Sequence, residues 1–308
     1  MSSPLVSVLI PCYNVAPFVK EAIDSIINQT YKNLEIWLID DASTDKTRSI
    51  LESYNDKRIK KVFYDVNTKK IGAVNDVLKM TSGSFVCFQD ADDYSKYDRI
   101  QKQVNFLLNN SDTEICFTGY EYVGDVIKNA VNFSLSNLDL IDEFLNFKAK
   151  KGPGKDPTCC PSMMITNNVI NIENGYHQYF SGRVAEDAHW IYRILKHTKG
   201  GVINEVLYHY RTRQGSFTQD QLSGKSAKYA YSWNLLERII QKDIKENIDL
   251  LHPVNNELLK QIELESCEEA LLESIVDSHR IKNAYENSRS FKIGRFFLAP
   301  LNLIRRLI

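Results

Sequence analysis

The chain has 308 residues, a formal net charge of −1, 43% hydrophobic residues and 25% charged residues. This length can bury a full hydrophobic core, and the composition is ordinary for a globular protein, which excludes the disordered and fibrous classes. The near-neutral charge lacks the basic excess of general nucleic-acid binders, so we expect no nucleic-acid partner.

Targeting signals are weak along most of the sequence. The apolar stretch at residues 5–10 is too short for a secretory signal and lacks a basic lead, and no run approaches the roughly 20 apolar residues of a membrane span. The six cysteines have no metal-site spacing, and three of them fall in apolar strand-like runs. We therefore expect buried thiols in a reducing, cytoplasmic compartment, with Cys159–Cys160 either a redox pair or part of a plain loop.

Strand and helix patterns alternate through the first half of the chain. Strands are predicted at residues 6–10, 34–39, 61–64 and 85–88, and helices at 17–29, from 43 or 44 towards 54, and at 71–80. This alternation of apolar strands with helices indicates a mostly parallel sheet covered on both faces. Ligands of such sheets bind at the carboxyl ends of the strands.

The second half is less regular. Strands are predicted at residues 115–118 and 202–210, a helix at 184–195 and a loop at 148–161. After about residue 220 the pattern becomes helical without strands. We place a domain boundary there, followed by a helical extension over residues 221–287.

The most informative stretch is the acidic cluster after the strand at 85–88. Asp90, Asp92 and Asp93 follow a buried strand, and charge is costly to bury, so the cluster is expected to face a cleft. Asp90 and Asp92 can offer hard oxygen ligands to one divalent cation, which then has open positions for phosphate oxygens. A second acidic pair, Asp40–Asp41, ends the strand at 34–39. Ordinary acidic turns and helix-capping acids have the same appearance.

Residues 288–308 combine basic side chains with aromatic and aliphatic ones and contain no acidic residue. This composition is typical of a segment that lies in the interface of an anionic membrane. The alternative is a terminal helix that packs on the body of the protein or on a partner subunit.

Several motifs, taken in order, resemble the family 2 glycosyltransferases, which are inverting enzymes with the GT-A fold. The resemblance covers roughly residues 4–220. It is carried by residues 6–14 (VSVLIPCYN) and 39–45 (IDDASTD), by Asn75 and Gly83, by residues 90–93 (DADD), by Glu186–Asp187 with Trp190 and Arg193, and by residues 208–211 (YHYR). It implies an α/β fold of the GT-A type, Rossmann-like, with helices on both faces of a mostly parallel sheet and a helical C-terminal extension. The nucleotide-sugar half would span about residues 1–110 and the acceptor half about 111–220.

The resemblance also implies roles for individual residues on the donor side. Pro11, Tyr13 and Asn14 would line the nucleotide pocket, and Asp41 would accept a hydrogen bond from the base, most commonly uracil. Asp92 would bind Mn²⁺ or Mg²⁺, Asp90 would contact the ribose or the metal, and Asp93 would hold the donor sugar or brace the loop. Further donor contacts are assigned to Asn75, His209 and Arg211.

On the acceptor side, Asp187 is implied as the general base that takes the proton of the attacking hydroxyl, with Glu186 orienting it. The alternative is an acidic first turn that complements the helix dipole. The chain departs from the family pattern at Val74, where relatives often carry arginine. A basic contact to the nucleotide then comes from Lys69, Lys70 or Arg99, or is absent.

These observations predict a glycosyltransferase that moves a sugar from a nucleotide diphosphate, most often UDP, to a glycan or lipid-linked glycan in polysaccharide biosynthesis. The basic tail at 288–308 would hold it on the inner face of the plasma membrane. A dehydrogenase would need a glycine-rich turn where residues 11–14 read Pro-Cys-Tyr-Asn. A catalytically silent, membrane-associated protein that binds sugar nucleotides is the alternative.

Overall fold

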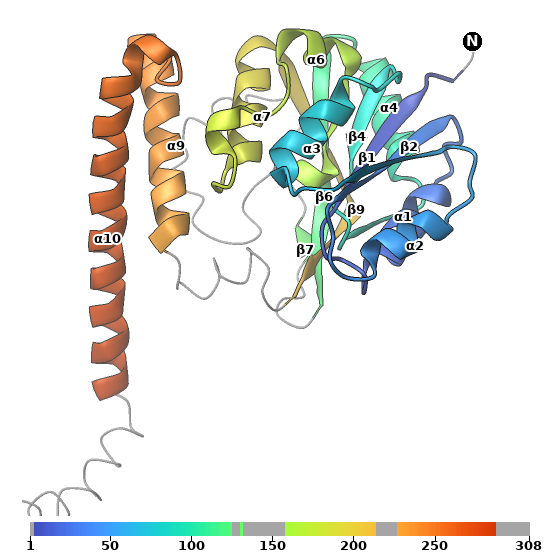
Figure 1. Cartoon of the computed structure of the whole chain (residues 1–308). Coiled ribbons are helices and arrows are strands. Elements are labelled where there is room, and N and C mark those ends of the chain that lie inside the picture. The colour runs from blue at the N-terminus through green and yellow to red at the C-terminus, as the bar shows by residue number, and fades with distance from the viewer. Residues whose placement is uncertain (1–2, 125–129, 132–157, 214–226, 288–308) are drawn as a thin grey trace, which may run out of the picture.

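The computed structural model describes residues 3–124, 130–131, 158–213 and 227–287 (Figure 1). The predicted tail at 288–308, the boundary near residue 220 and most of the loop at 148–161 lie outside these residues, and the predicted division into domains stays a prediction.

The first half forms the predicted alternation of strands and helices. Its elements are β1 (Val6–Cys12), α1 (Val19–Ile27), β2 (Leu34–Asp41), α2 (Thr47–Ser53), β3 (Ile59–Tyr64), α3 (Lys69–Leu78) and β4 (Phe85–Phe88). The four strands are parallel, with β1 between β2 and β4. Their carboxyl ends therefore share one edge of the sheet, and both acidic clusters follow at that edge.

The second half extends the same sheet. Its elements are β5 (Tyr94–Ser95), α4 (Arg99–Asn109), β6 (Thr113–Gly124), β7 (Ala130–Val131), η2 (Cys160–Ser162), β8 (Met164–Thr166), α6 (Asn167–Ile172), η3 (Gln178–Phe180), α7 (Glu186–His197) and β9 (Lys199–Thr212). In the described residues the strand order is β3-β2-β1-β4-β8-β6-β9-β5, with β7 beside β6. The short β8 is antiparallel to β4 and β6, so the sheet is mixed and mostly parallel, as predicted.

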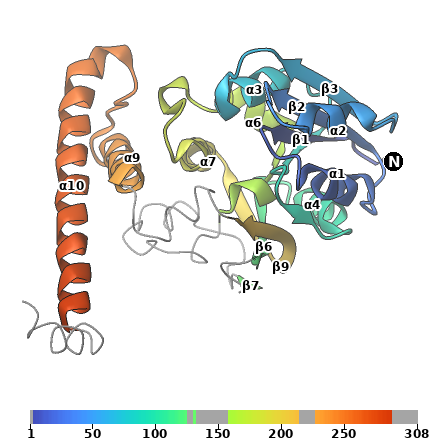
Figure 2. The same ribbon diagram turned by 60° about the horizontal axis from the view of Figure 1, so that its bottom comes forward.

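Helices cover both faces of the sheet (Figure 2). Leu9, Val86 and Phe117 pack with α3, α6 and α7 on one face, whereas Val8 and Cys87 pack with α1 and α4 on the other. Because successive side chains of a strand point to opposite faces, burial of both faces explains the uninterrupted apolar runs.

Two C-terminal helices form a hairpin beside α7 (Figure 1). They are α9 (Ala227–Glu246) and α10 (Asn256–Asn287), joined through η4 (Pro253–Asn255). Leu236 and Ile240 of α9 and Ile262 of α10 are buried in the same cluster as α7, which attaches the hairpin to the body of the fold. Within the described residues, no helix has both the length and the hydropathy that a membrane crossing requires.

Candidate active site

The acidic turn after β4 is fastened to β9 through Asp93. The hydroxyl of Tyr208 donates to Asp93 Oδ2 at 2.8 Å, and the backbone N–H of Arg211 donates to Oδ1 at 2.7 Å. Burial, together with Asp92 and Asp90, raises the pKa of Asp93 well above its ordinary value. Because both of its oxygens bind protein groups, this geometry favours the bracing role of Asp93 over a contact with the donor sugar.

Asp90 and Asp92 are the accessible carboxylates of the turn, with side chains 28% and 23% exposed. Each lies beside a basic side chain: Lys70 Nζ lies 3.3 Å from Asp90 Oδ1, and Arg213 Nε donates to Asp92 Oδ2 at 2.8 Å. Arg213 was missed in the sequence, although the two-residue period of a strand continues from His209 and Arg211 to it.

The two carboxylates suit a divalent cation that also binds the substrate. Their oxygens are the hard ligands that Mg²⁺ and Mn²⁺ prefer. Among the residues that the structure describes, no group of three or more His, Cys, Asp or Glu side chains can hold a metal. Asp90 and Asp92 are two oxygen ligands of the kind that such a cation takes.

Residues 11–14 lie at the same edge and comprise the last two residues of β1 and the two that follow it. The side-chain oxygen of Asn14 accepts the N–H of Thr44 at 2.8 Å, and its own N–H donates to Ser43 Oγ at 3.0 Å. Asn14 thus ties the loop after β1 to the loop after β2, with a left-handed φ of 51°. Tyr13 is 49% exposed and Pro11 is half-buried, so Tyr13 presents the open surface of this loop.

Asp40 and Asp41 have different environments because they point to opposite faces of β2. Asp41 Oδ1 accepts the N–H and the hydroxyl of Thr68 at 2.7 and 2.9 Å. Asp40 is fully buried, and neither of its oxygens has a hydrogen-bond partner in the described part of the chain. Its ion-pair partner is Arg48, with Nε at 3.6 Å. Asp40 is therefore enclosed beside Arg48, whereas the two contacts of Asp41 with Thr68 involve only Oδ1, and the contact of Asp41 with the base stays a prediction.

The acidic pair Glu186–Asp187 forms the start of α7. Ala185 precedes it with a left-handed φ of 73°, and Asp187 Oδ1 accepts the N–H of Ala188 at 2.7 Å. Burial raises the pKa of Glu186 to about 7, Asp187 adds to this increase, and Lys70 opposes it. Glu186 therefore titrates near neutral pH.

Lys70 joins the two acidic groups into one site. Burial acts to lower its pKa, but Asp90, Tyr176, Cys160 and Glu186 outweigh burial and hold the pKa well above its ordinary value. The ammonium of Lys70 is therefore charged between the turn after β4 and the start of α7.

The other two basic residues considered for this contact are placed differently. Arg99 is fully buried and donates to the carbonyls of Phe88 and Pro161 at 2.9 and 3.0 Å. It therefore supports the end of β4 from inside the protein, and the prediction that it contacts the nucleotide is wrong. Lys69 has a left-handed φ of 65° at the start of α3. Lys70 precedes the buried Val74 by four residues, which places both on one face of α3.

Asn75 binds protein rather than presenting its amide to a cleft. Its Nδ2 donates to the carbonyl of Tyr176 at 2.7 Å, and its Oδ1 accepts the N–H of Tyr176 at 2.8 Å. Gly175 has a φ of +81°, and a Cβ at this position would lie 2.3 Å from Asn75 Oδ1. Asn75 therefore fastens α3 to the loop that leads to α7, and its donor contact stays a prediction.

His209 and Arg211 lie on β9 but have different partners. The ring of His209 stacks on Tyr94 at 4.3 Å, with Nδ1 2.6 Å from the carboxylate of Glu121. Arg211 Nε donates to the carbonyl of Asp92 at 2.8 Å, and its guanidinium pairs with Glu21. Of the two, Arg211 reaches the acidic turn.

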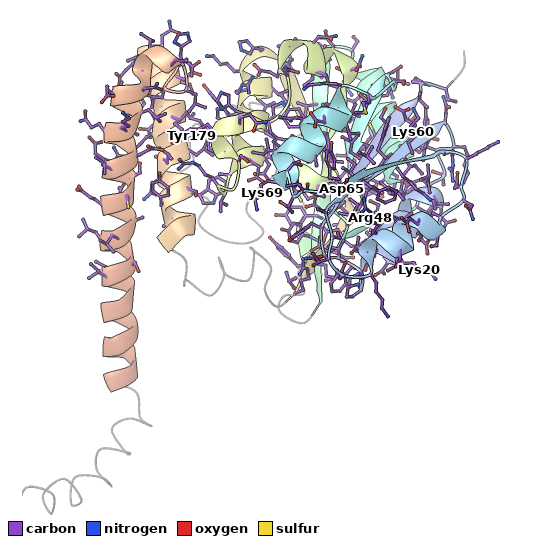
Figure 3. The ribbon with its side chains drawn as sticks, in the orientation of Figure 1. Lys20, Arg48, Lys60, Asp65, Lys69 and Tyr179 are labelled. Atoms are coloured by element: carbon purple, nitrogen blue, oxygen red, sulfur yellow. The ribbon has the colours of Figure 1, made fainter. Side chains whose placement is uncertain are left out.

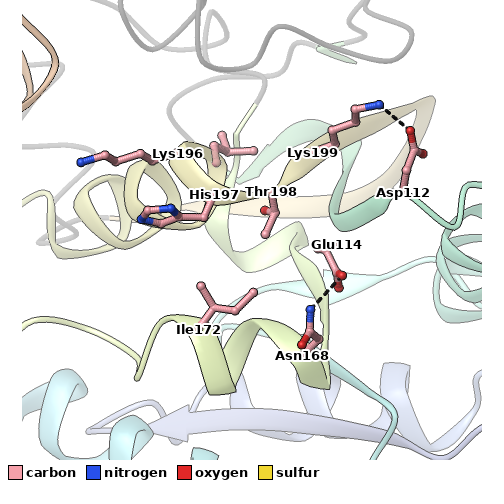
Figure 4. A pocket seen from close by; sticks show the side chains of 9 residues that line it. Asp112, Glu114, Asn168, Ile172, Lys196, His197, Thr198 and Lys199 are labelled. Atoms are coloured by element: carbon pink, nitrogen blue, oxygen red, sulfur yellow. Dashed lines mark hydrogen bonds and ion pairs between the residues drawn. The ribbon is translucent and has the colours of Figure 1, made fainter.

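A separate cavity of about 440 Å³ lies between the C-terminal end of α7, α6 and the first residues of β6 and β9 (Figure 4). Its charged groups are paired: Lys199 with Asp112 at 2.5 Å, and Glu114 with Asn168 at 3.0 Å. This cavity contains none of the predicted site residues.

The fold and the site together define an α/β protein with an acidic sheet edge and with Lys70 between two acidic groups. The sequence model of glycosyl transferase family 2 matches residues 7–171, and the chain belongs to this family. Its sheet and helices have the GT-A arrangement.

Two curated relatives match part of the chain. The putative teichuronic acid biosynthesis glycosyltransferase TuaG of Bacillus subtilis is 38% identical over 119 residues, which cover 38% of this chain and 47% of TuaG. The UDP-Glc:alpha-D-GlcNAc-diphosphoundecaprenol beta-1,3-glucosyltransferase WfgD of Escherichia coli is 33% identical over 125 residues, which cover 41% of this chain and 49% of WfgD. The chain thus spans about half the length of these relatives.

Solved structures resemble the chain over most of its length. One is the S. aureus TarS 1-349 complex with UDP-GlcNAc, with 18% identity and a TM-score of 0.61. The match covers 88% of this chain and 80% of the TarS chain. Another is mannosyltransferase PcManGT of Pyrobaculum calidifontis in complex with GDP-Man and Mn²⁺, with 18% identity and a TM-score of 0.57. The match covers 97% of this chain and 85% of the PcManGT chain. At this identity the likeness concerns the fold.

Proposed function

We propose that the protein is an inverting glycosyltransferase that moves a sugar from a UDP-sugar to a hydroxyl of a glycan or a lipid-linked glycan. The observation that carries this proposal is the position of Lys70, 3.3 Å from Asp90 and among the charges that act on Glu186. A donor-binding turn and a candidate acceptor base thereby belong to a single site.

Asp90 and Asp92 would hold Mn²⁺ or Mg²⁺ on the donor side. A bound cation supplies charge neutralisation for the departing diphosphate. Arg211 and Arg213 lie against the same turn and add positive charge beside it. The relative PcManGT is described with GDP-Man and Mn²⁺, which supports a divalent cation in this fold.

The nucleotide would lie at the carboxyl ends of β1 and β2. Tyr13 offers an exposed ring there, and Asp41, whose contacts with Thr68 involve Oδ1, would accept an N–H of the base through Oδ2. An N–H of a pyrimidine base satisfies such an acceptor. We assign UDP because TarS is described with UDP-GlcNAc and because WfgD is named for a UDP-Glc donor.

On the acceptor side, Asp187 would take the proton of the attacking hydroxyl while the oxygen approaches the anomeric carbon opposite the diphosphate. Glu186 would orient Asp187 or the acceptor. Holding both substrates in line lowers the entropic part of the barrier. WfgD is named for a diphosphoundecaprenol-linked acceptor and TuaG for teichuronic acid biosynthesis, which supports a lipid-linked glycan and cell-surface polysaccharide synthesis.

A membrane-borne acceptor agrees with the basic, apolar composition of residues 288–308. We place the protein on the cytoplasmic face of the plasma membrane, held by this segment.

The test starts with a screen of nucleotide sugars by thermal shift, with Mn²⁺ or Mg²⁺, because ligands of the native state raise its melting temperature. The stabilising donor is then combined with lipid-linked glycan acceptors, and transfer is compared between the wild type and Asp187→Ala. Transfer that depends on Asp187 supports the enzyme. Binding of donor without transfer to any acceptor would favour the alternative, a catalytically silent sugar-nucleotide-binding protein.

A further inference from the structure

Four side chains from the hairpin and the body of the fold form one hydrogen-bonded network. Arg183, in the loop before α7, donates to the Tyr231 hydroxyl of α9 and to Glu263 of α10, both at 3.1 Å. The hydroxyl of Tyr179, in η3, also donates to Glu263. The Arg183 guanidinium lies 4.5 Å above the centre of the Tyr179 ring. Tyr179 lies where the hairpin meets the body of the fold (Figure 3).

This network holds the loop that leads into the acidic pair. Arg183 Nε donates to the carbonyl of Tyr179 at 3.1 Å, which closes the loop on itself. Gly182 and Ala185, on either side, have left-handed φ values of 74° and 73°. An alanine takes this conformation only where its surroundings impose it. The contacts of Arg183 lie in this same short segment, between Gly182 and Ala185, and connect it to the hairpin.

The hairpin also holds the other end of α7. The hydroxyl of Tyr192 donates to Asp243 of α9 at 2.6 Å, and the ammonium of Lys196 lies 2.7 Å from the same carboxylate. Between these two attachments, Leu236 and Ile240 pack in the same buried cluster as Ile191. The hairpin thus contacts the C-terminal half of α7 and the segment that precedes this helix.

From this geometry we infer that the α9–α10 hairpin positions Glu186 and Asp187 for the acceptor, with Arg183 and Glu263 as the positioning residues. The inference rests on the proposed glycosyl transfer. It assigns the hairpin to the acceptor step, because the donor turn at Asp90–Asp93 is fastened separately, to β9 through Tyr208.

The experiment compares Arg183→Gln, Glu263→Gln and the double variant with the wild type. We expect each single variant to lower kcat by about ten-fold to a hundred-fold, because misplacement of a catalytic group by about 1 Å can lower the rate about a hundred-fold. The KM for the donor should stay within about two-fold, and the double variant should lose little more than either single one, because residues of one network are not additive.

The control is Arg238→Gln. Arg238 links the same two helices through Glu265 and Glu269, at 2.8 and 3.3 Å. It should keep wild-type kcat. An unchanged kcat in both network variants, or an equal loss in Arg238→Gln, would overturn the inference.

A second measurement is independent of turnover. Hydrogen exchange at residues 179–187 should be faster in Glu263→Gln than in the wild type and in Arg238→Gln. Unchanged exchange in Glu263→Gln counts against the positioning role even if no acceptor is found. Absence of transfer by the wild type, in contrast, tests the proposed function.

Discussion

The ammonium of Lys70 lies 3.3 Å from the carboxylate of Asp90, and Glu186 is among the groups that hold its pKa high. A residue at the start of α3 thereby balances the charge of two acidic groups that are almost a hundred residues apart in the chain. Its removal would leave these carboxylates to repel one another and would weaken a site for a diphosphate.

Lys70→Gln should raise the KM for the donor by about ten-fold, since a hydrogen bond between charged groups contributes about 1.5–3 kcal/mol and this one is partly exposed. Initial rates at varied donor concentration measure the effect. Lys79→Gln is the matched control, because Lys79 lies just after the same helix, is 60% exposed and pairs only loosely with Asp76. Equal KM values for the wild type and Lys70→Gln would contradict the role of Lys70.

Asp92→Asn should abolish the stabilisation by metal and UDP together. The substitution removes a charged oxygen that would hold the cation, so the variant should bind metal and UDP together less tightly. The melting temperature is measured with UDP, with and without Mn²⁺, and after chelation. Asp65→Asn serves as the control because its side chain is 94% exposed. A full metal-dependent shift in Asp92→Asn would remove Asp92 from the metal site.

Asp187→Asn should lower the rate of transfer by about 10²–10⁴-fold, which is the usual contribution of general base catalysis. The amide keeps the size of the side chain but takes no proton. Binding of UDP, followed by calorimetry, should be unchanged. Asp112→Asn, an exposed position paired with Lys199, is the control. Retained transfer in Asp187→Asn would point to Glu186 as the base.

The strands of the donor half could be predicted because β1, β2 and β4 are buried on both faces and read as apolar runs. The helix α4 was missed because Arg99 and Gln103 are fully buried on its inner face, where a sequence pattern expects apolar side chains. The strand β8 has three residues, too few for any periodicity.

Within the site, the position of the acidic groups at the sheet edge could be predicted from the sequence, but their hydrogen-bond partners could not. The bonds of Asn75 to Tyr176 span 101 residues, and those of Tyr208 and Arg211 to Asp93 span 115 and 118. Such contacts depend on how the second half of the sheet folds over the first, and local spacing does not encode that. Asp40 and Asp41 are a further example: the motif treats them as one pair, whereas Asp40 is enclosed beside Arg48 and Asp41 accepts hydrogen bonds from Thr68.

Removal of residues 288–308 should weaken binding to liposomes that contain anionic lipid. This segment carries basic side chains among apolar ones, and each such charge near an anionic surface contributes about 1 kcal/mol. Sedimentation with anionic and with neutral vesicles measures the effect, and transfer to a water-soluble acceptor should be retained. Equal sedimentation of the full chain and the truncated chain would contradict membrane attachment by this segment.

Glu186 should make the stability of the protein depend on pH. Burial and Asp187 raise its pKa from 4.5 to about 7 in the folded state. The folded chain therefore keeps a proton between these values that the unfolded chain has released, and the free energy of unfolding falls as the pH rises through that window. The side chain in Glu186→Gln does not titrate. The free energy of unfolding of Glu186→Gln minus that of the wild type should therefore be larger at about pH 8 than at about pH 5, as measured by urea unfolding.

The control, Glu257→Gln, changes a carboxylate that is 88% exposed and should show no such difference. A stability difference between Glu186→Gln and the wild type that is the same at both pH values would show that Glu186 is already ionised at the lower one, and its part in orienting Asp187 would then be that of a fixed negative charge.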